Sequence, residues 1–298
     1  MEWNKITLDE KQVMEKFYQY RISKGCEQSF GNNFLWSDIY RTKVGFIEDC
    51  MVFRTEKTHS VSFPIGEQPL RAIPALREYL KEIGEPFRMG LVIPEQFAML
   101  DVAFPGEFQI AYRRQEADYI YRTESLITLA GKKLHAKRNH INRFRENNPD
   151  WTFEVVTDEN VDECIEMARL WIETTTGGNT EDKRAEVEVT IRALKEREDI
   201  GLDAGLLRAG GRVIAFSLGE PMGKDMYVVH IEKAFGDIQG AYPMINREFA
   251  SYFAKDYEYI NREEDLGEEG LRKAKLSYYP EMIYEKGLVT LVEESKLR

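Results

Sequence analysis

The segment Lys132–Arg145 holds the densest set of side chains that could bind an anion. It contains six Lys and Arg residues, two His, two Asn and no acidic residue. At 100° per residue, Leu134 and Ile141 share one side of a helix, which would pack on a domain. The other side would present several cationic donors at once, as the binding of phosphate or carboxylate requires. The polar side carries His135 and Asn139, and Lys137 and Arg138 flank the apolar stripe. A solvated helix that balances the acidic second half of the chain is the alternative interpretation.

Two further candidates lie around the end of a strand predicted for residues 226–232. Glu232 ends this strand, where a carboxylate could serve as a general base for an attacking amine. An ion-paired surface acid is the alternative interpretation of Glu232. Gly240 precedes a helix predicted for 241–254, and the backbone amides at a helix N-terminus bind anions. Asp237 lies three residues before Gly240, where its negative charge would face a bound phosphate.

A third polar set occupies residues 261–280. Acidic residues open and basic residues close a helix predicted for 268–276, which complements the helix dipole, so part of the pattern is helix stabilisation. Arg272 and Lys275 lie three residues apart on one face of this helix, and Tyr278 follows directly. A functional and a stabilising interpretation both remain open for this set, which also contains Asn261, Asp265 and Ser277.

The elements that must position these side chains repeat one order in the two halves of the chain. Each half is predicted to run helix, three antiparallel strands, helix, strand, helix, strand. In the first half the predicted ranges are 8–21, 36–47, 50–55, 60–63, 70–83, 87–92, 95–100, 108–112 and 119–121. In the second half they are 160–175, 181–197, 204–209, 212–220, 226–232, 241–254, 257–260, 268–276, 282–285 and 288–292, with a loop at 174–179.

This order matches the GNAT acyltransferase fold, in which a helix packs beside a splayed strand pair that opens a slot for an acyl donor. The predicted fold class is α/β (α+β), with two tandem GNAT-like acyltransferase domains, each a mixed, mostly antiparallel sheet flanked by helices. The predicted parts are an N-terminal GNAT-like domain (1–125), a basic linking helix (126–149) and a C-terminal GNAT-like domain (150–298). GNAT enzymes bind the donor pyrophosphate at the turn that Gly240 would occupy. Asp237 breaks their usual Gln/Arg-x-x-Gly-x-Gly/Ala pattern there, which argues against ordinary coenzyme A binding at that turn.

The composition excludes several classes of protein. The net charge is −11, and residues 1–150 hold 22 Lys and Arg against 21 Asp and Glu, so the acidic excess lies in the second half. Such a half repels nucleic acid at long range. Three widely spaced Cys residues indicate neither a disulfide framework nor a zinc site, and no metal is predicted. The N-terminus has no apolar signal segment and no run of about 18 apolar residues occurs, so we expect a cytoplasmic protein without membrane insertion.

The phrases Lys132–Phe144, Tyr259–Asp265 and Leu271–Pro280 carry a resemblance over most of the chain. They resemble an uncharacterised bacterial family related to the C-terminal domain of phosphatidylglycerol lysyltransferases. That family consists of tandem GNAT-like domains, similar to the Fem-type aminoacyltransferases, and its membrane-bound relatives move an amino acid from aminoacyl-tRNA to a lipid headgroup. The site residues that the resemblance implies are Lys137, Arg138, Asn139, Arg262, Asp265, Arg272, Lys275 and Tyr278.

The sequence therefore predicts an acyl or aminoacyl transferase, moving the group from a coenzyme A thioester or aminoacyl-tRNA to an amine or hydroxyl acceptor. Glu232 would be the base and Tyr278 the acid, and the basic helix with Arg272 and Lys275 would hold the donor's phosphates. The alternative is a non-catalytic GNAT-like module that binds a phosphorylated or acyl metabolite. A third hypothesis is contact with tRNA through the basic helix alone. The sequence fixes neither a cofactor nor an oligomeric state.

Overall fold

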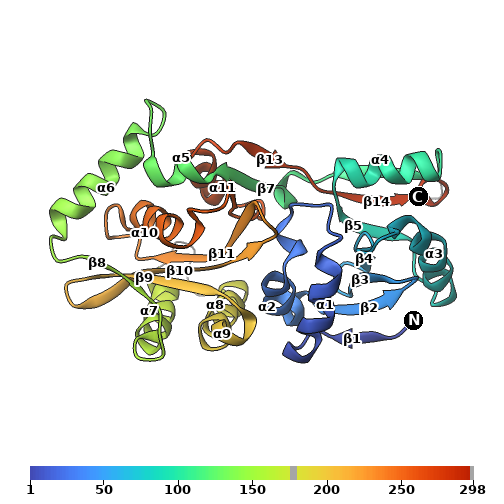
Figure 1. Cartoon of the computed structure of the whole chain (residues 1–298), viewed down its shortest axis with the longest axis horizontal. Helices are drawn as coiled ribbons and strands as arrows, with labels where there is room; N and C mark the ends of the chain where they lie inside the picture. The colour runs from blue at the N-terminus through green and yellow to red at the C-terminus, as the bar shows by residue number, and fades with distance from the viewer. Residues whose placement is uncertain (175–179, 296–298) are drawn as a thin grey trace. The chain divides into compact units, whose positions relative to one another are not determined.

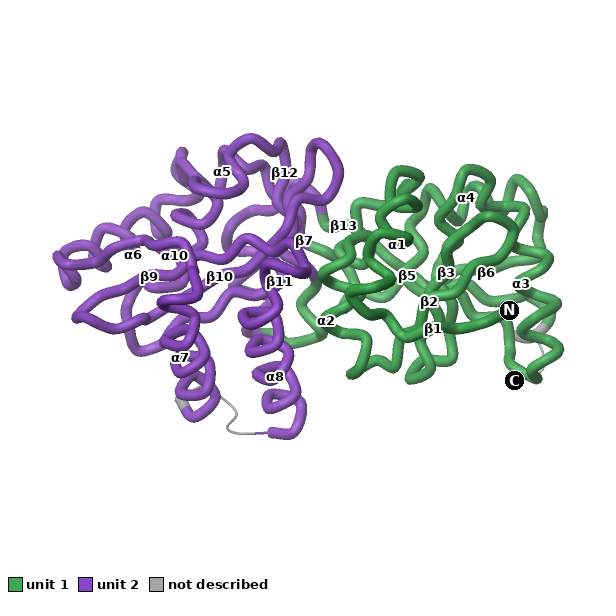
Figure 2. Tube along the Cα trace, turned by 60° about the horizontal axis from the view of Figure 1, so that its bottom comes forward, with its two compact units in different colours: residues 1–118, 264–269, 283–298 green, residues 119–263, 270–282 purple. Residues whose placement is uncertain are grey.

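The computed structural model describes residues 1–174 and 180–295, which form two compact units (Figures 1 and 2). Unit 1 consists of Met1–Asp118, Glu264–Glu269 and Ile283–Arg298, and unit 2 consists of Tyr119–Glu263 and Gly270–Met282. Of the loop predicted for 174–179, residues 175–179 lie outside the described residues. Each unit contains segments from both halves of the sequence. The predicted domains, 1–125 and 150–298, instead take one half of the sequence each, and this division stays a prediction.

The sheet of unit 1 has seven strands in the order β1-β2-β3-β4-β5-β14-β6. Neighbouring strands are antiparallel except β4 and β5, which are parallel and pair through Val61 and Met89. The strands are β1 (Trp3–Lys5), β2 (Thr42–Ile47), β3 (Cys50–Thr55), β4 (Ser60–Val61), β5 (Arg88–Val92), β6 (Phe108–Tyr112) and β14 (Gly287–Leu291).

The second sheet has seven strands in the order β13-β7-β12-β11-β10-β9-β8. The pairs β8–β9, β9–β10 and β10–β11 are antiparallel, β11 and β12 are parallel, and β12 and β7 are antiparallel. The strands are β7 (Asp118–Arg122), β8 (Thr152–Val155), β9 (Asp203–Ala209), β10 (Arg212–Met222), β11 (Met226–Ala234), β12 (Tyr259–Asn261) and β13 (Met282–Tyr284).

The two sheets therefore share one strand order, and each contains one strand from the other half of the sequence. In unit 1 the C-terminal strand β14 lies between β5 and β6, and in the second sheet β7 lies between β12 and β13. Gly287 begins β14 at a close approach, since a Cβ there would lie 2.7 Å from a side-chain carbon of Ile110 on β6. This reciprocal exchange of strands joins the halves of the chain through backbone hydrogen bonds.

Helices cover both sheets, and in unit 2 they lie on two sides. Figure 1 shows α7, α8 and α9 on one side of the β8–β11 strands and α5, α6 and α10 on the other. The α-helices are α1 (Lys11–Tyr18), α2 (Phe30–Tyr40), α3 (Ala72–Glu82), α4 (Pro94–Ala103), α5 (Thr123–Thr128), α6 (His135–Asn147), α7 (Val161–Thr174), α8 (Glu181–Lys195), α9 (Arg197–Ile200), α10 (Ala241–Phe249), α11 (Glu269–Leu276) and α12 (Val292–Ser295). Short 3-10 turns occur at Leu8–Glu10, Cys26–Gln28, Pro69–Arg71 and Arg114–Glu116, and a π-helical turn at Ala250–Ala254 continues α10.

Each unit has its own apolar core. In unit 1, Ile73 and Leu76 of α3 are fully buried in a cluster with Val52, Met89 and Val289 of the sheet. In unit 2, the largest buried side chains include Phe216, Tyr227 and Phe249 on the sheet and α10, and Phe144 on α6. The predicted fold class is confirmed: the chain has two mixed, mostly antiparallel sheets in tandem, each flanked by helices and each with one parallel strand pair.

The predicted strand at 36–47 is wrong in its first half. Residues 30–40 form the helix α2, and only 42–47 form a strand. Aromatic and β-branched residues favour a strand in this stretch, but Ser29 caps the helix by accepting a hydrogen bond from the Asn32 amide at 3.3 Å. Arg41 ends the helix with a left-handed backbone conformation. The local caps therefore decide the structure, against the propensity of the residues between them.

Candidate functional site

The parallel strands of the second sheet diverge soon after they pair. Met226–Val228 of β11 pairs with Tyr259–Asn261 of β12. Strand β11 then continues to Ala234, whereas the segment after β12 turns away at Glu263, which has a φ of 58°. Side chains two residues apart on a strand point to the same face. The register of β11 against β10 shifts between Ile231 and Val229 and leaves His230 as an extra residue, so this rule does not hold between His230 and Glu232. Both residues lie in the part of β11 that has separated from β12.

Glu232 lies at the centre of a buried polar cluster in unit 2. Its Oε1 accepts a hydrogen bond from Arg262 Nη2 at 2.8 Å, and its Oε2 accepts one from Asn246 Nδ2 at 3.0 Å. The side chains of Glu232 and Arg262 are 12% and 11% exposed, and Asn246 on α10 is buried. A buried ion pair with a further amide donor is a fixed, low-dielectric environment, where charges interact more strongly than in water.

Two tyrosines and a lysine complete this cluster, which we call the Glu232 cluster. The Nζ of Lys137 lies 3.9 Å from the ring centroid of Tyr278, and the guanidinium carbon of Arg262 lies 5.0 Å from the same centroid. Tyr121 packs edge-on against Tyr278, with 6.4 Å between ring centroids. Strand, helix and loop segments that are far apart in the sequence thus bring these polar groups together.

The protonation states in this cluster follow from burial and charge. Burial raises the pKa of Tyr278 well above its ordinary value, against the opposing effect of Arg262, so its hydroxyl stays protonated and can donate. Burial, and then the positive charge of Arg262, lower the pKa of Lys137 to about 8. The cluster therefore combines a fixed cation, a carboxylate, a neutral phenol and an amine that titrates near neutral pH.

Two buried atoms in the cluster have no hydrogen-bond partner among the residues that the structure describes. They are Nη1 of Arg262, a donor, and Oδ1 of Asn246, an acceptor. Buried polar atoms are almost always paired in folded proteins, so an unpaired donor and an unpaired acceptor on the two residues that hold Glu232 indicate a place for a ligand. That ligand would offer a hydrogen-bond acceptor to Arg262 and a donor to Asn246.

A second buried network fixes the backbone beside the cluster. His230 lies between Glu220 and Glu263, at 2.9 Å from its Nε2 and 2.8 Å from its Nδ1. Burial alone would lower the pKa of His230, but the two carboxylates raise it to about 10. A doubly hydrogen-bonded imidazolium therefore ties the chain after β12 to β11.

Raising the pH from 7 to 10 is expected to destabilise unit 2 through His230. The native pKa of about 10 lies above the ordinary value of about 6.5. The stabilisation is therefore complete below about pH 6.5 and is lost as the pH rises through the native pKa. Thermal unfolding of the wild type and of His230→Gln at each pH isolates this effect, because other groups titrate in both. The difference between the two proteins should shrink toward pH 10, and a difference independent of pH would contradict the assignment.

Lys275 and Asn261, both predicted as binding residues, act in the structure on the main chain. The Nζ of Lys275 donates to the carbonyls of Arg262 at 2.6 Å and Glu263 at 3.2 Å. The buried side chain of Asn261 accepts from the Glu263 amide at 2.7 Å. They hold the turn that carries Arg262. Arg272, one turn before Lys275 on α11, is half-buried.

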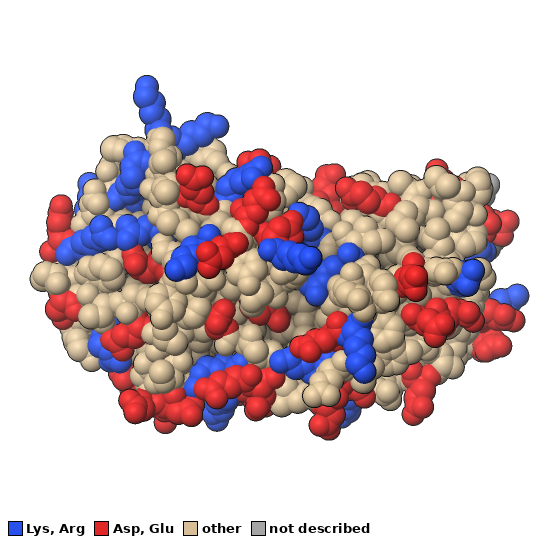
Figure 3. Space-filling view, in the orientation of Figure 1, with Lys and Arg blue, Asp and Glu red and all other residues tan. Residues whose placement is uncertain are grey.

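Helix α6 begins three residues after the start predicted for it, and Lys and Arg gather over it at the upper left of Figure 3. Arg138 donates to the Leu129 carbonyl and, at 2.8 Å, to the Gly131 carbonyl. The predicted residues His135, Arg138 and Asn139 lie together at a pocket of about 190 Å³ in unit 2. The remaining lining residues are Thr128, Leu129, Ile141, Asn142 and Arg247. Lys137 belongs instead to the Glu232 cluster.

Gly240 makes close packing of two helices possible. Its φ is +84°, and a Cβ at this position would lie 2.3 Å from the His140 carbonyl oxygen and 2.9 Å from the Cβ of Phe144. The backbone of α6 therefore lies against the N-terminus of α10, where the sequence suggests an anion site. In this structure Gly240 contacts protein.

Asp265 belongs to unit 1 and is used there. Its carboxylate accepts from Arg114 Nη1 at 3.1 Å and from the Gly267 amide at 2.9 Å. It therefore stabilises a turn of unit 1 and does not count among the residues of the Glu232 cluster.

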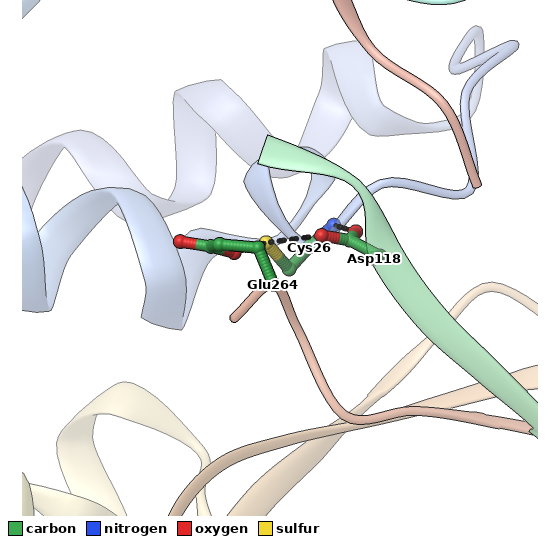
Figure 4. A group of neighbouring side chains, drawn as sticks. All are labelled: Cys26, Asp118 and Glu264. Atoms are coloured by element: carbon green, nitrogen blue, oxygen red, sulfur yellow. Dashed lines mark hydrogen bonds between the residues drawn. The ribbon is translucent and has the colours of Figure 1, made fainter. Parts of the chain in front are cut away.

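Unit 1 contains a second group of buried ionisable side chains, around Lys286. Its Nζ donates to Asp118 at 2.7 Å and to Glu27 at 3.0 Å, and lies 3.9 Å from the Sγ of Cys26. Burial raises the pKa of Glu27, against the opposing charge of Lys286. Figure 4 shows Cys26, Asp118 and Glu264, whose sulfur and oxygen atoms lie within 4.8 Å of one another. Sequence spacing gives no signal for this group, because Cys26 and Glu27, Asp118, and Glu264 with Lys286 come from three parts of the chain that lie more than 90 positions apart and share no known motif.

The comparisons with known proteins agree with this architecture. A family model described as "Phosphatidylglycerol lysyltransferase, C-terminal" matches residues 20–289. A crystal structure of a conserved protein of unknown function from Bacteroides thetaiotaomicron covers 97% of this chain and 99% of its own, with 37% identity and a TM-score of 0.91. The C-terminal domain of a putative lysylphosphatidylglycerol synthetase from Agrobacterium fabrum shares the fold at 15% identity, with a TM-score of 0.65 over 96% of this chain and 92% of that one.

A curated relative covers less of the sequence. An uncharacterised protein of Mycoplasmoides gallisepticum is 24% identical over 181 residues, which are 59% of this chain. The match spans 56% of that relative's length. Within the described residues of our chain, every helix is too short or too polar to cross a bilayer.

Proposed function

Because this chain belongs to the family of phosphatidylglycerol lysyltransferase C-terminal domains, we propose that it is a transferase that moves an aminoacyl group to an amine or hydroxyl acceptor in the Glu232 cluster. The coarser class, an acyl or aminoacyl transferase, is supported by the family and the fold. The identity of the donor and of the acceptor belongs to the proposal.

The observation that carries the proposal is the pair of unpartnered atoms beside Glu232. An aminoacyl ester offers a carbonyl oxygen, which would accept from Arg262 Nη1. It also offers an α-ammonium group, which would donate to Asn246 Oδ1 and to Glu232. A plain acyl group has no such ammonium donor, so Asn246 Oδ1 would stay unpaired.

The chemistry needs little beyond position and charge. The acceptor attacks the carbonyl carbon, a bond from the acceptor to carbon forms, and the ester carbon–oxygen bond breaks. Negative charge develops on the carbonyl oxygen, beside Arg262 and the protonated Tyr278, and preorganised donors of this kind stabilise the transition state. Glu232 would orient the ammonium, and Tyr278 would donate its proton or a hydrogen bond.

The contact between Gly240 and α6 favours aminoacyl-tRNA over a coenzyme A thioester as donor. The α10 N-terminus faces the backbone of α6, and the turn between β11 and α10 contains the acidic residue Asp237. This turn is therefore a poor binding site for a pyrophosphate. The cations of α6 and its pocket would instead contact phosphates of an RNA end.

The test is a transfer assay with two donors, a tRNA pool charged with radiolabelled amino acids and radiolabelled acetyl-coenzyme A, each with a panel of amine and hydroxyl acceptors. We expect product from charged tRNA, with binding that weakens steeply as salt rises. Lys132→Gln, shortly before α6, combined with Arg143→Gln on α6 should weaken tRNA binding, while Lys81→Gln in unit 1 serves as the control. Product from acetyl-coenzyme A alone would reverse the choice of donor. Binding of either donor without any product would favour the non-catalytic module.

A further inference from the structure

Lys137 differs from the other cations that the structure describes around the Glu232 cluster. Arg262 is paired with Glu232, and Lys275 donates to two carbonyls. Lys137 is half-buried, and among the described residues its contact is with the face of Tyr278 at 3.9 Å, with neither a hydrogen bond nor an ion pair. Its three N–H donors are thus available, on the side of the cluster where Arg262 also meets Tyr278.

The charged groups that face Lys137 are Arg262 and Glu232. Arg262 comes from the turn after β12 and disfavours the ammonium form, whereas Glu232 of β11 favours it and burial opposes it. Tyr278, from the loop after α11, contributes a neutral ring. From α10, which packs on α6, Arg247 lies at the Arg138 pocket and is ion-paired with Glu248. Burial therefore disfavours the ammonium form of Lys137 most, and the permanent positive charge of Arg262 adds to this effect.

Glu232 is poorly placed to accept a proton from the acceptor. Each of its two oxygens already accepts a hydrogen bond, from Arg262 and from Asn246. In the proposed complex it would also face the α-ammonium of the substrate. Its geometry suits it to hold charges in place, which leaves the proton transfer to another group.

We propose that Lys137 is the proton acceptor of this site, a catalytic role that rests on the proposed function. In the attack, the acceptor's O–H or N–H proton moves to the neutral Nζ of Lys137 as the new bond to the carbonyl carbon forms. The carbonyl electron pair moves onto the oxygen beside Arg262. When that pair returns, the ester carbon–oxygen bond breaks and the Lys137 ammonium delivers its proton to the leaving oxygen. The amine is regenerated neutral, so no further reactant is required.

Competitive labelling tests the basic group without any substrate. The full chain is treated with a trace of isotopically labelled acetic anhydride between pH 6.5 and 11, and peptide mass spectrometry follows each lysine. Lys137 should react with a midpoint near pH 8, whereas an unperturbed lysine titrates at about 10.4. Exposed Lys132 in the same digest corrects for decay of the reagent. A midpoint for Lys137 at the ordinary lysine value would overturn the inference.

Substitutions of the two charged neighbours should shift the labelling midpoint of Lys137 in opposite directions. A general change of the fold would not produce opposite shifts. Arg262→Met removes the charge that lowers the pKa of Lys137 and should move its midpoint up. Glu232→Gln removes the charge that raises this pKa and should move the midpoint down. Shifts in the same direction would indicate general loosening of the site and would contradict the proposed electrostatics.

The activity arm separates the inference from the proposed function. In the charged-tRNA assay, Lys137→Met should lower kcat/KM by about 10²–10⁴-fold, remove the acidic limb near pH 8 and be partly rescued by added small primary amines. Lys81→Met, at an exposed lysine of unit 1 outside the site, is the matched control. An active wild type with an unchanged profile in Lys137→Met would overturn the inference alone. If the wild type transfers nothing from either donor, the proposed function fails, and the labelling midpoint decides whether Lys137 is a basic amine.

Discussion

Replacing Lys286 by methionine is expected to lower the free energy of unfolding by about 3–5 kcal/mol, since removal of one partner of a buried ion pair leaves an uncompensated charge. Lys286 is 2% exposed and donates to Asp118, which is buried, and to Glu27, whose side chain is 12% exposed. Methionine has a similar length and leaves no cavity, so the lost charge accounts for the effect. Lys286 also directly precedes β14, and its loss should loosen the strand that unit 1 receives from the other half of the chain.

Urea unfolding followed by fluorescence measures this change, with Lys81→Met on the exposed end of α3 as the control. The loss should become smaller at acidic pH, where protonation of the carboxyl groups removes the repulsion. Adding Asp118→Asn to Lys286→Met should recover part of the stability, because it removes one of the unpaired charges. A loss below about 1 kcal/mol, typical of an exposed ion pair, would show that Lys286 does not neutralise this group.

The second large effect is expected at Arg262. In the proposed transfer Arg262 is the cation beside the developing oxyanion, so Arg262→Met should lower kcat by about 10²–10³-fold. It also leaves Glu232 without its ion-pair partner, so stability should fall as well. Kinetics with charged tRNA and thermal unfolding are measured on the same preparation.

A double substitution distinguishes catalysis from stability at this site. Arg262→Met with Glu232→Gln removes both charges, so it should regain much of the thermal stability of the wild type while staying inactive. Arg77→Gln in unit 1, which breaks an exposed ion pair with Glu107, is the control for loss of an arginine. Recovery of activity in the double variant would show that Arg262 matters only through the fold.

Much of the fold follows from local patterns. The order of strands around β9–β11 and the helix α10 follow from alternation and helical spacing, because these signals act within a few residues. The pairing of β14 with β5 and β6 could not be predicted, since alternation marks Val289 as part of a strand but says nothing about its neighbours. The same limit explains β7, whose residues 119–121 are predicted as a strand of the first domain and lie in the second sheet.

The candidate site was predicted in parts. Glu232, Arg262, Lys137 and Tyr278 are each identified from residue type or family resemblance, and the structure brings these four together. Asn246 was missed because an Asn inside an amphipathic helix gives no signal of its own. The sequence also does not show which of the predicted cations already have protein partners in the folded chain. This pairing decides which of them can contact a substrate.

The exchange of strands has a consequence for how the protein is made. Translation delivers β7 before the rest of the second sheet, so that sheet can close as soon as β12 and β13 leave the ribosome. The first sheet has to wait for Gly287–Leu291, with β5 and β6 unpaired along the edges that β14 later fills. At about 5–20 residues per second, roughly 180 residues separate β6 from β14, so this gap stays open for about 9–36 seconds. The nascent N-terminal half is therefore the part of this protein for which chaperones should matter most.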